Sequence, residues 1–175
     1  METAKPPTPQ PEVWLRGPLP DIVSLLQHVA HALLQVREDV DAIVEDLPSA
    51  LLWERPSGAA SPGFHLQHLS GVIDRLFTYA RAESLSEDQL RDLENEGVPP
   101  TAGTTSAGLR QDLEERVETA LAQLRLTPER ILREERKVGR QGLPSTVLVL
   151  LVHAAEHTER HVGQLLVTVK ILRER

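Results

Sequence analysis

The spacing of apolar residues predicts a long amphipathic helix near the start of the chain. From residue 22 to residue 47, apolar side chains are separated alternately by four and three positions, as in a helix that buries one face in a bundle. These side chains are Ile22, Leu26, Val29, Leu33, Val36, Val40, Ile43 and Leu47. Asp21 is a typical N-cap residue and Pro48 a typical helix terminator, so we expect the helix to lie between them.

Three further long helices are predicted downstream. The second runs from about residue 61 to residue 82, and the third from about 106 to 124, where an apolar residue recurs every fourth position. The last opens at Pro144 and Ser145 and runs nearly to the C-terminus. Four long helices with connections of unequal length predict an all-α four-helix bundle.

The connections between these helices are rich in turn-forming residues. A short helix is expected after Ser86, ended by Gly97, and another at Pro128. Residues 98–108 and 138–144 are predicted to be loops, because no segment shows the alternation of a strand.

The first 20 residues differ from the rest because they contain six of the 13 prolines. This composition predicts an extended N-terminal arm over residues 1–20, which packs through Trp14 and Leu15. The bundle domain is then predicted to occupy residues 21–175.

Composition narrows the possible functions. The chain of 175 residues contains no cysteine, which excludes disulfides, thiolate metal sites and a cysteine nucleophile. A net charge of −7 and only five aromatic residues argue against nucleic-acid binding. The chain has no apolar run of about 18 residues, and its start lacks the apolar core of a signal peptide. We therefore expect a cytoplasmic protein with no membrane partner.

Histidines supply the candidate chemistry. His153, His157 and His161 are spaced by four on the last helix, so their rings lie about 40° apart and can converge on one ion. The same predicted inward face carries Leu150, Ala154, Leu165 and Thr168. The alternative is a set of hydrogen-bonded core histidines. His28 and His31 fall outside the apolar face of the first helix and are predicted to be solvated.

The second helix carries another pair, His65 and His68. Its periodicity places His65 nearer the apolar centre, without deciding between the two. One histidine from this helix and two from the last would give a set of three imidazoles that leaves coordination positions open. No H-E-x-x-H motif is present, which excludes the common zinc-peptidase arrangement.

Two segments together resemble the DinB/YfiT-like superfamily of metal-binding four-helix bundles. The segment LLWERPSGAASPGFHLQHLSGVIDRLF resembles the family's loop with Trp-x-x-Pro, followed by a helix whose ligand histidine precedes an aliphatic residue, here His68 before Leu69. HAAEHTERHVGQLL resembles the closing helix, with His161 before VGQ and His157 four residues earlier. The match covers about residues 15–173, although the tryptophan usual just before the second helix is absent.

The resemblance implies a ligand set and a topology. The ligands would be His68, His157 and His161, in place of His65, with His153 lining or supporting the pocket. The ion would be one divalent metal, with Zn or Ni expected first. The helices would run up-down-down-up, with the long connection between the second and third.

The resemblance also implies an activity. Members include metal-dependent S-transferases that use low-molecular-weight thiols such as bacillithiol or mycothiol, a maleylpyruvate isomerase and many uncharacterised proteins regarded as hydrolases. A metal-dependent hydrolase or thiol S-transferase acting on a small molecule is therefore expected, with any thiol supplied by a cosubstrate. The alternative is a non-catalytic, metal-stabilised binding or dimerisation module, and a homodimer is compatible with either.

The sequence identifies no general base. Asp74 and Glu156 are the carboxylates that could orient an imidazole, and Gln164 could hydrogen-bond near the site. Arg75 and Arg160 could bind an anionic substrate. For the four charged residues, a solvated surface position is the stronger expectation.

Overall fold

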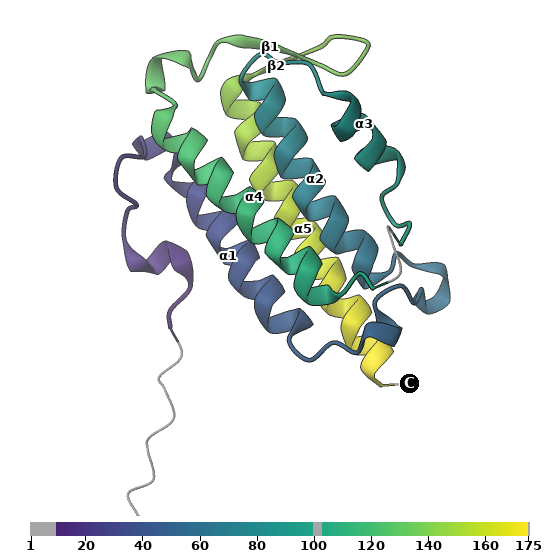
Figure 1. Cartoon of the computed structure of the whole chain (residues 1–175). Coiled ribbons are helices and arrows are strands. Elements are labelled where there is room, and N and C mark those ends of the chain that lie inside the picture. Colours follow the sequence, from purple (N-terminus) through teal and green to yellow (C-terminus); the bar gives the residue numbers. More distant parts are fainter. Residues whose placement is uncertain (1–9, 100–102, 175) are drawn as a thin grey trace, which may run out of the picture.

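Four long helices form the body of the protein (Figure 1). The structure is a computed structural model that describes residues 10–99 and 103–174. The long helices are α1 (Gln27–Val44), α2 (Pro62–Ala80), α4 (Ser106–Leu126) and α5 (Val147–Arg173). The shorter elements are α3 (Glu87–Glu94) and two strands, β1 (Glu135–Val138) and β2 (Leu143–Thr146).

The helices run up-down-down-up. In Figure 1, α1 and α5 point in one direction along the bundle and α2 and α4 in the other. α5 packs between α1 and α2, and α4 packs against the same two helices from the other side. The long connection joins α2 to α4 and carries α3, so the predicted fold class and topology are confirmed.

The predicted apolar faces form the core. Leu26, Leu33, Val36 and Val40 of the first segment are completely buried, as are Leu66, Leu69 and Ile73 of α2. Full burial of each such side chain stabilises the fold by roughly 1.5–3 kcal/mol. Among the helices of the described residues, none is both long and apolar enough to cross a membrane.

The first helix begins later than predicted. Asp21 has a positive φ of 62° and is not an N-cap; α1 starts only at Gln27, after a short 3-10 turn at Ser24–Leu26. The Gln27 side chain accepts a hydrogen bond from the backbone N–H of Leu19 at 2.8 Å and donates to two backbone carbonyls. These bonds hold residues 19–22 as a bend across the start of the helix.

The described part of the N-terminal arm packs on α1, but through a different residue than predicted. Trp14 and Leu15 are 58% and 56% exposed, whereas Val13 is only 4% exposed. The backbone N–H of Val13 donates to Gln35 of α1 at 3.0 Å. Residues Val13–Arg16 form one turn of 3-10 helix, in which the Val13 side chain is buried and those of Trp14 and Leu15 are exposed. Residues 1–9 of the predicted arm lie outside the described residues.

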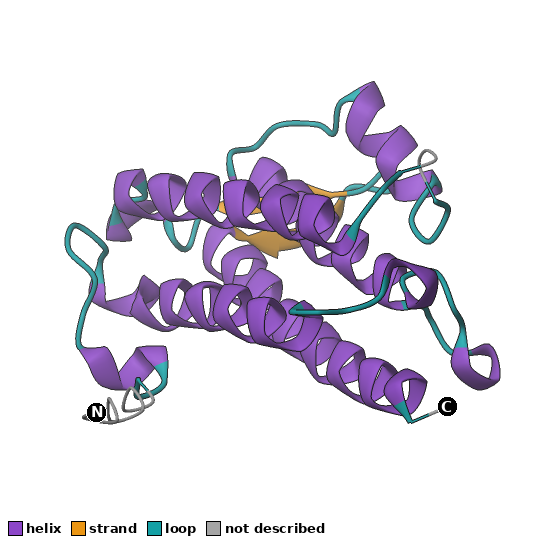
Figure 2. Ribbon diagram, turned by 60° about the horizontal axis from the view of Figure 1, so that its bottom comes forward, coloured by secondary structure: helices purple, strands orange, loops and turns teal. Residues whose placement is uncertain are grey.

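A small antiparallel hairpin corrects the prediction of a loop before the last helix. Glu135 pairs with Thr146 and Val138 with Leu143. The two strands (orange in Figure 2) lie at the end of the bundle where α2 ends and α5 begins (Figure 1). Each strand has only four residues, too few to give a recognisable alternation. Pro144 and Ser145 therefore belong to β2, and Thr146 caps α5 by accepting from the backbone N–H of Val149.

The other short elements agree with the sequence. Ser86 and Gln89 form a capping box at the start of α3, and a 3-10 turn follows Pro128. In the predicted loop at 98–108, residues 100–102 lie outside the described residues, and α4 already begins at Ser106.

Candidate metal centre

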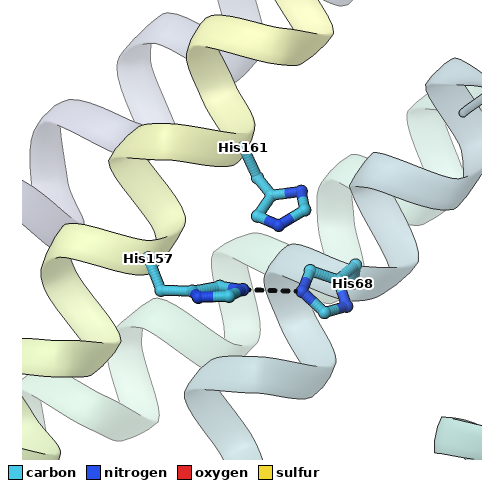
Figure 3. A group of neighbouring side chains, drawn as sticks. All are labelled: His68, His157 and His161. Carbon is cyan, nitrogen blue, oxygen red and sulfur yellow. Dashed lines mark hydrogen bonds between the residues drawn. The ribbon is translucent and has the colours of Figure 1, made fainter. Parts of the chain in front are cut away.

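Three histidines from two helices face one another in the seam between α2 and α5. His68 comes from α2, and His157 and His161 come from adjacent turns of α5 (Figure 3). One ring nitrogen from each of these half-buried residues lies within 4.8 Å of the other two. The Nε2 atoms of His68 and His157 are 2.9 Å apart, and a ring nitrogen of His161 points toward them (Figure 3). The group could therefore hold a metal ion.

The start of α2 is fixed by its own capping and by a tryptophan. Ser61 caps the helix by accepting from the backbone N–H of Phe64, and Pro62 occupies the first turn. The Trp53 ring lies so close to Gly63 that an added Cβ would be 2.5 Å from a ring carbon. Only glycine allows this contact, so the loop carrying Trp53 packs tightly on the helix that carries His68.

The His68 ring is held by a carboxylate and an aromatic ring. Its Nδ1 lies 2.6 Å from Oε2 of Glu96, whose Oε1 forms an ion pair with buried Arg75 at 2.8 Å. Burial raises the pKa of Glu96, but the hydrogen bond with His68 and the Arg75 charge outweigh it, so that the pKa is lowered overall. Phe64 stacks on His68 with ring centroids 5.3 Å apart. His68 therefore donates through Nδ1, and its Nε2 lone pair points toward the other histidines.

His161 is paired with another histidine. Its Nδ1 lies 3.1 Å from Nδ1 of His65, which is 3% exposed. Burial, with the nearby His68 charge, lowers the pKa of His65 and of His161 to about 4, so both rings are neutral at pH 7. Two neutral rings share one proton between these Nδ1 atoms, and in the tautomer in which His161 donates, its Nε2 is left free to bind an ion. Periodicity thus predicted the burial of His65 correctly, while the three clustered rings are those that the family resemblance implied.

His157 provides the test of whether the site suits a cation. Its Nδ1 is buried and has no hydrogen-bond partner among the residues that the structure describes. Burial, with the charges of His68 and other neighbours, lowers the pKa of His157. Two Nε2 lone pairs 2.9 Å apart repel unless a proton or a cation lies between them. In a tetrahedral site with bonds of about 2.0–2.1 Å, ligand nitrogens are about 3.3 Å apart. The spacing and the three imidazole donors fit a divalent ion.

The remaining histidines have other partners. His153 is exposed rather than inward-facing; its Nδ1 is 2.8 Å from Glu156, and its ring contacts the edge of His157. His28 is exposed, as predicted. The prediction for His31 was wrong: it is 8% exposed and bonds to the Gly17 carbonyl at 3.0 Å, because the N-terminal arm covers that part of α1.

The carboxylates proposed from the sequence do not orient the clustered rings. Asp74 pairs with Arg116 at 2.7 Å and accepts from Gln89, and Glu156 contacts His153. The residue that bonds to His68 is Glu96, which lies 28 residues away in sequence. It follows α3 in a polar stretch with no distinguishing pattern, so nothing in the sequence separates it from nearby acids.

The two arginines differ. Arg75 is buried with Glu96, which corrects the expectation of a solvated position, whereas exposed Arg160 pairs with Glu156 on α5. Gln164 is exposed. A cavity of about 690 Å³ lies between α2, α3 and α4 and is lined by Arg75 and Glu96 but by none of the three clustered histidines.

Comparison with known proteins identifies the family. The model of the DinB superfamily matches residues 32–165, which is most of the chain. The protein belongs to the DinB superfamily. A crystal structure of a Streptococcus pneumoniae protein resembles this DinB-superfamily chain with a TM-score of 0.61 and 15% identity, covering 83% of this chain and 88% of the other. At that identity the likeness shows the fold alone. None of the curated proteins matches.

Proposed function

We propose that this DinB-superfamily protein is a divalent-metal-dependent enzyme that acts on a small molecule, by hydrolysis or by thiol transfer. The observation that carries the proposal is the convergence of His68, His157 and His161 on one point between α2 and α5. A set of three protein ligands leaves a position for water or substrate, which is the arrangement of catalytic rather than structural zinc sites.

The donor set favours a borderline metal. Three neutral imidazoles suit Zn or Ni better than Mg or Ca, which prefer oxygen ligands. When bound, such an ion is a Lewis acid that lowers the pKa of a water or thiol in its open position. The chain contains no cysteine, so in the thiol reaction the sulfur comes from a cosubstrate.

The surrounding residues orient the imidazole rings, keep them neutral and provide polar groups that a substrate could contact. Glu96 orients His68 and His65 pairs with His161, while the lowered pKa of His157 and of His161 keeps both imidazoles neutral. His153 and Arg160 are two of the exposed polar residues of α5 near these histidines, and both contact the exposed carboxylate of Glu156. Both can contact a substrate there without displacing a ligand.

Metal analysis of untagged protein tests the first half of the proposal. We expect about one equivalent of Zn or Ni in the wild-type protein, and its loss in the variants His68→Ala, His157→Ala and His161→Ala. His28→Ala removes an exposed histidine of α1 that is not part of the cluster and is the matched control, which should keep its metal. Equal metal content in all five proteins would contradict the proposed ligand set.

Turnover tests the second half. The metal-loaded protein is assayed with monochlorobimane and a panel of low-molecular-weight thiols, and separately with small ester substrates. We expect a rate that the His157→Ala variant lacks. A protein that binds metal but turns over no member of either panel would favour a non-catalytic metal-stabilised module, and its oligomeric state would then show whether the module dimerises.

A further inference from the structure

We propose that Glu96 is a positioning residue, which fixes the His68 ring so that Nε2 faces His157 and His161. The long connection between α2 and α4 would then be part of the metal centre, because it carries this carboxylate. The role of Glu96 in metal binding rests on the proposed function, whereas the effect of Glu96 on the His68 ring can be measured without any metal.

The contact is short and shielded from water. Oε2 of Glu96 lies 2.6 Å from His68 Nδ1, and the side chains are 9% and 16% exposed. Oε1 is 2.8 Å from Arg75, so the second oxygen of the carboxylate is held as well. A carboxylate in an ion pair can only accept a hydrogen bond, which requires the proton of a neutral His68 to be on Nδ1.

The connection is attached to α2 on both sides of Glu96. On one side, the Gln89 side chain donates to Asp74 and to Thr78, each at 2.8 Å. On the other side, the backbone N–H of Gly97 donates to Gln67 at 2.8 Å. These bonds leave the backbone around Glu96 little freedom, so the position of the carboxylate is set by the fold.

Glycine at position 71 makes room for the ion pair. A Cβ added to Gly71 would lie 2.5 Å from Nη1 of Arg75 and 2.7 Å from Oε1 of Glu96. Glycine is unfavourable inside a helix, and here its absent side chain allows both charged groups to lie against α2. Gly163 of α5 is also helical, but a Cβ there would meet nothing within 4 Å.

This pair of glycines provides a matched experiment. Gly71→Ala retains every ligand and the carboxylate but forces the two charged groups to move, whereas Gly163→Ala adds the same methyl group in open space. Glu96→Ala removes the carboxylate, and Glu94→Ala removes an exposed carboxylate two residues away. Arg75→Ala/Glu96→Ala removes both charges and is the alternative if Glu96→Ala fails to fold because Arg75 is left unpaired.

The readout is the proton position on His68, measured by long-range ¹⁵N–¹H NMR of metal-free protein. We expect the Nδ1–H form in the wild-type, Gly163→Ala and Glu94→Ala proteins. The Nε2–H form should become predominant in Glu96→Ala, or in the double variant, and should increase in Gly71→Ala. An Nε2–H form in the wild type, or an unchanged Nδ1–H form without the carboxylate, would overturn the proposal.

Metal affinity is the second readout, measured from Co²⁺ absorption and from Zn²⁺ competition with a chelator. Loss of such a hydrogen-bond partner weakens metal binding by about 10–100-fold, so we expect a decrease of that size in Glu96→Ala and none in Glu94→Ala. Equal affinity in these two variants would also overturn the proposal. If the wild type binds neither ion, the proposed function fails, while the NMR result still decides the role of Glu96.

Discussion

His31 and the clustered histidines are all polar rings removed wholly or partly from water, but their partners differ. His31 on α1 bonds to a fixed backbone carbonyl, that of Gly17. His68 and His157 on the α2–α5 seam instead bring two Nε2 atoms together, and no group in the described part of the chain bonds to His157 Nδ1. A histidine with a fixed acceptor is satisfied by the fold, whereas rings that face one another are suited to an exchangeable ligand. The two regions therefore contrast a buried ring that the fold itself satisfies with a group of rings that could hold a metal ion.

The largest expected effect is stabilisation by metal. Zinc at 100–1,000 times its Kd should raise the free energy of unfolding by about 3–4 kcal/mol, provided that the unfolded chain does not bind it. For a chain of this size that corresponds to an increase in Tm of about 5–15 °C. Differential scanning calorimetry with zinc and with EDTA measures it.

The comparison of regions gives the controls for this measurement. His157→Ala should lose the zinc-dependent increase in Tm, while His31→Ala should retain it on a lower baseline. An identical increase in both variants would mean that zinc acts elsewhere.

The next effect is a pH dependence of the metal-free protein. Burial lowers the pKa of His65 to about 4 in the folded state, from 6.5 when unfolded, with the nearby His68 charge adding to the effect. Between these values the unfolded chain binds more protons, so stability is complete above pH 6.5 and decreases as the pH falls toward 4. The contribution of this ring is about 1–3 kcal/mol.

Urea denaturation in EDTA at pH 7.0 and pH 4.5 measures that loss. His65→Gln cannot be protonated, and its stability should fall less over the same interval. A variant with the same pH dependence as the wild type would remove His65 from the explanation.

A smaller effect is expected for the structural histidine. His31→Ala deletes the hydrogen bond to the Gly17 carbonyl, which should destabilise the fold by about 0.5–1.5 kcal/mol. His28→Ala, on the exposed side of the same helix, should change stability by less than about 0.5 kcal/mol. Equal losses in the two variants, measured by urea denaturation, would show that the arm does not cover His31.

The sequence predicts the bundle well because a helix that buries one face has apolar residues at regular spacings of three and four positions. All eight apolar residues of the face predicted between Ile22 and Leu47 are buried. The four-residue spacing of His157 and His161 places both rings in one seam. The family resemblance, rather than periodicity, favours His68 over His65. Local pattern and shared motif thus contribute different parts of the prediction.

Contacts between segments that are distant in sequence produce no such periodic pattern. His31 is buried by an arm whose packing depends on Val13, and Glu96 reaches His68 from a polar connection. His153 shares the four-residue spacing of the clustered histidines, but it lies one turn nearer the N-terminus of α5 and is exposed there. These outcomes depend on which segments dock on a helix, and the helix's own sequence does not contain that information.

The pairing of α2 with α5 has a consequence for the order in which the protein matures. His68 and His157 are 89 residues apart, so their nitrogen atoms meet only after the two halves of the polypeptide have docked. A cation captured there would act as a reversible staple between the halves. Without that ion, the final helix would be held less firmly against α2.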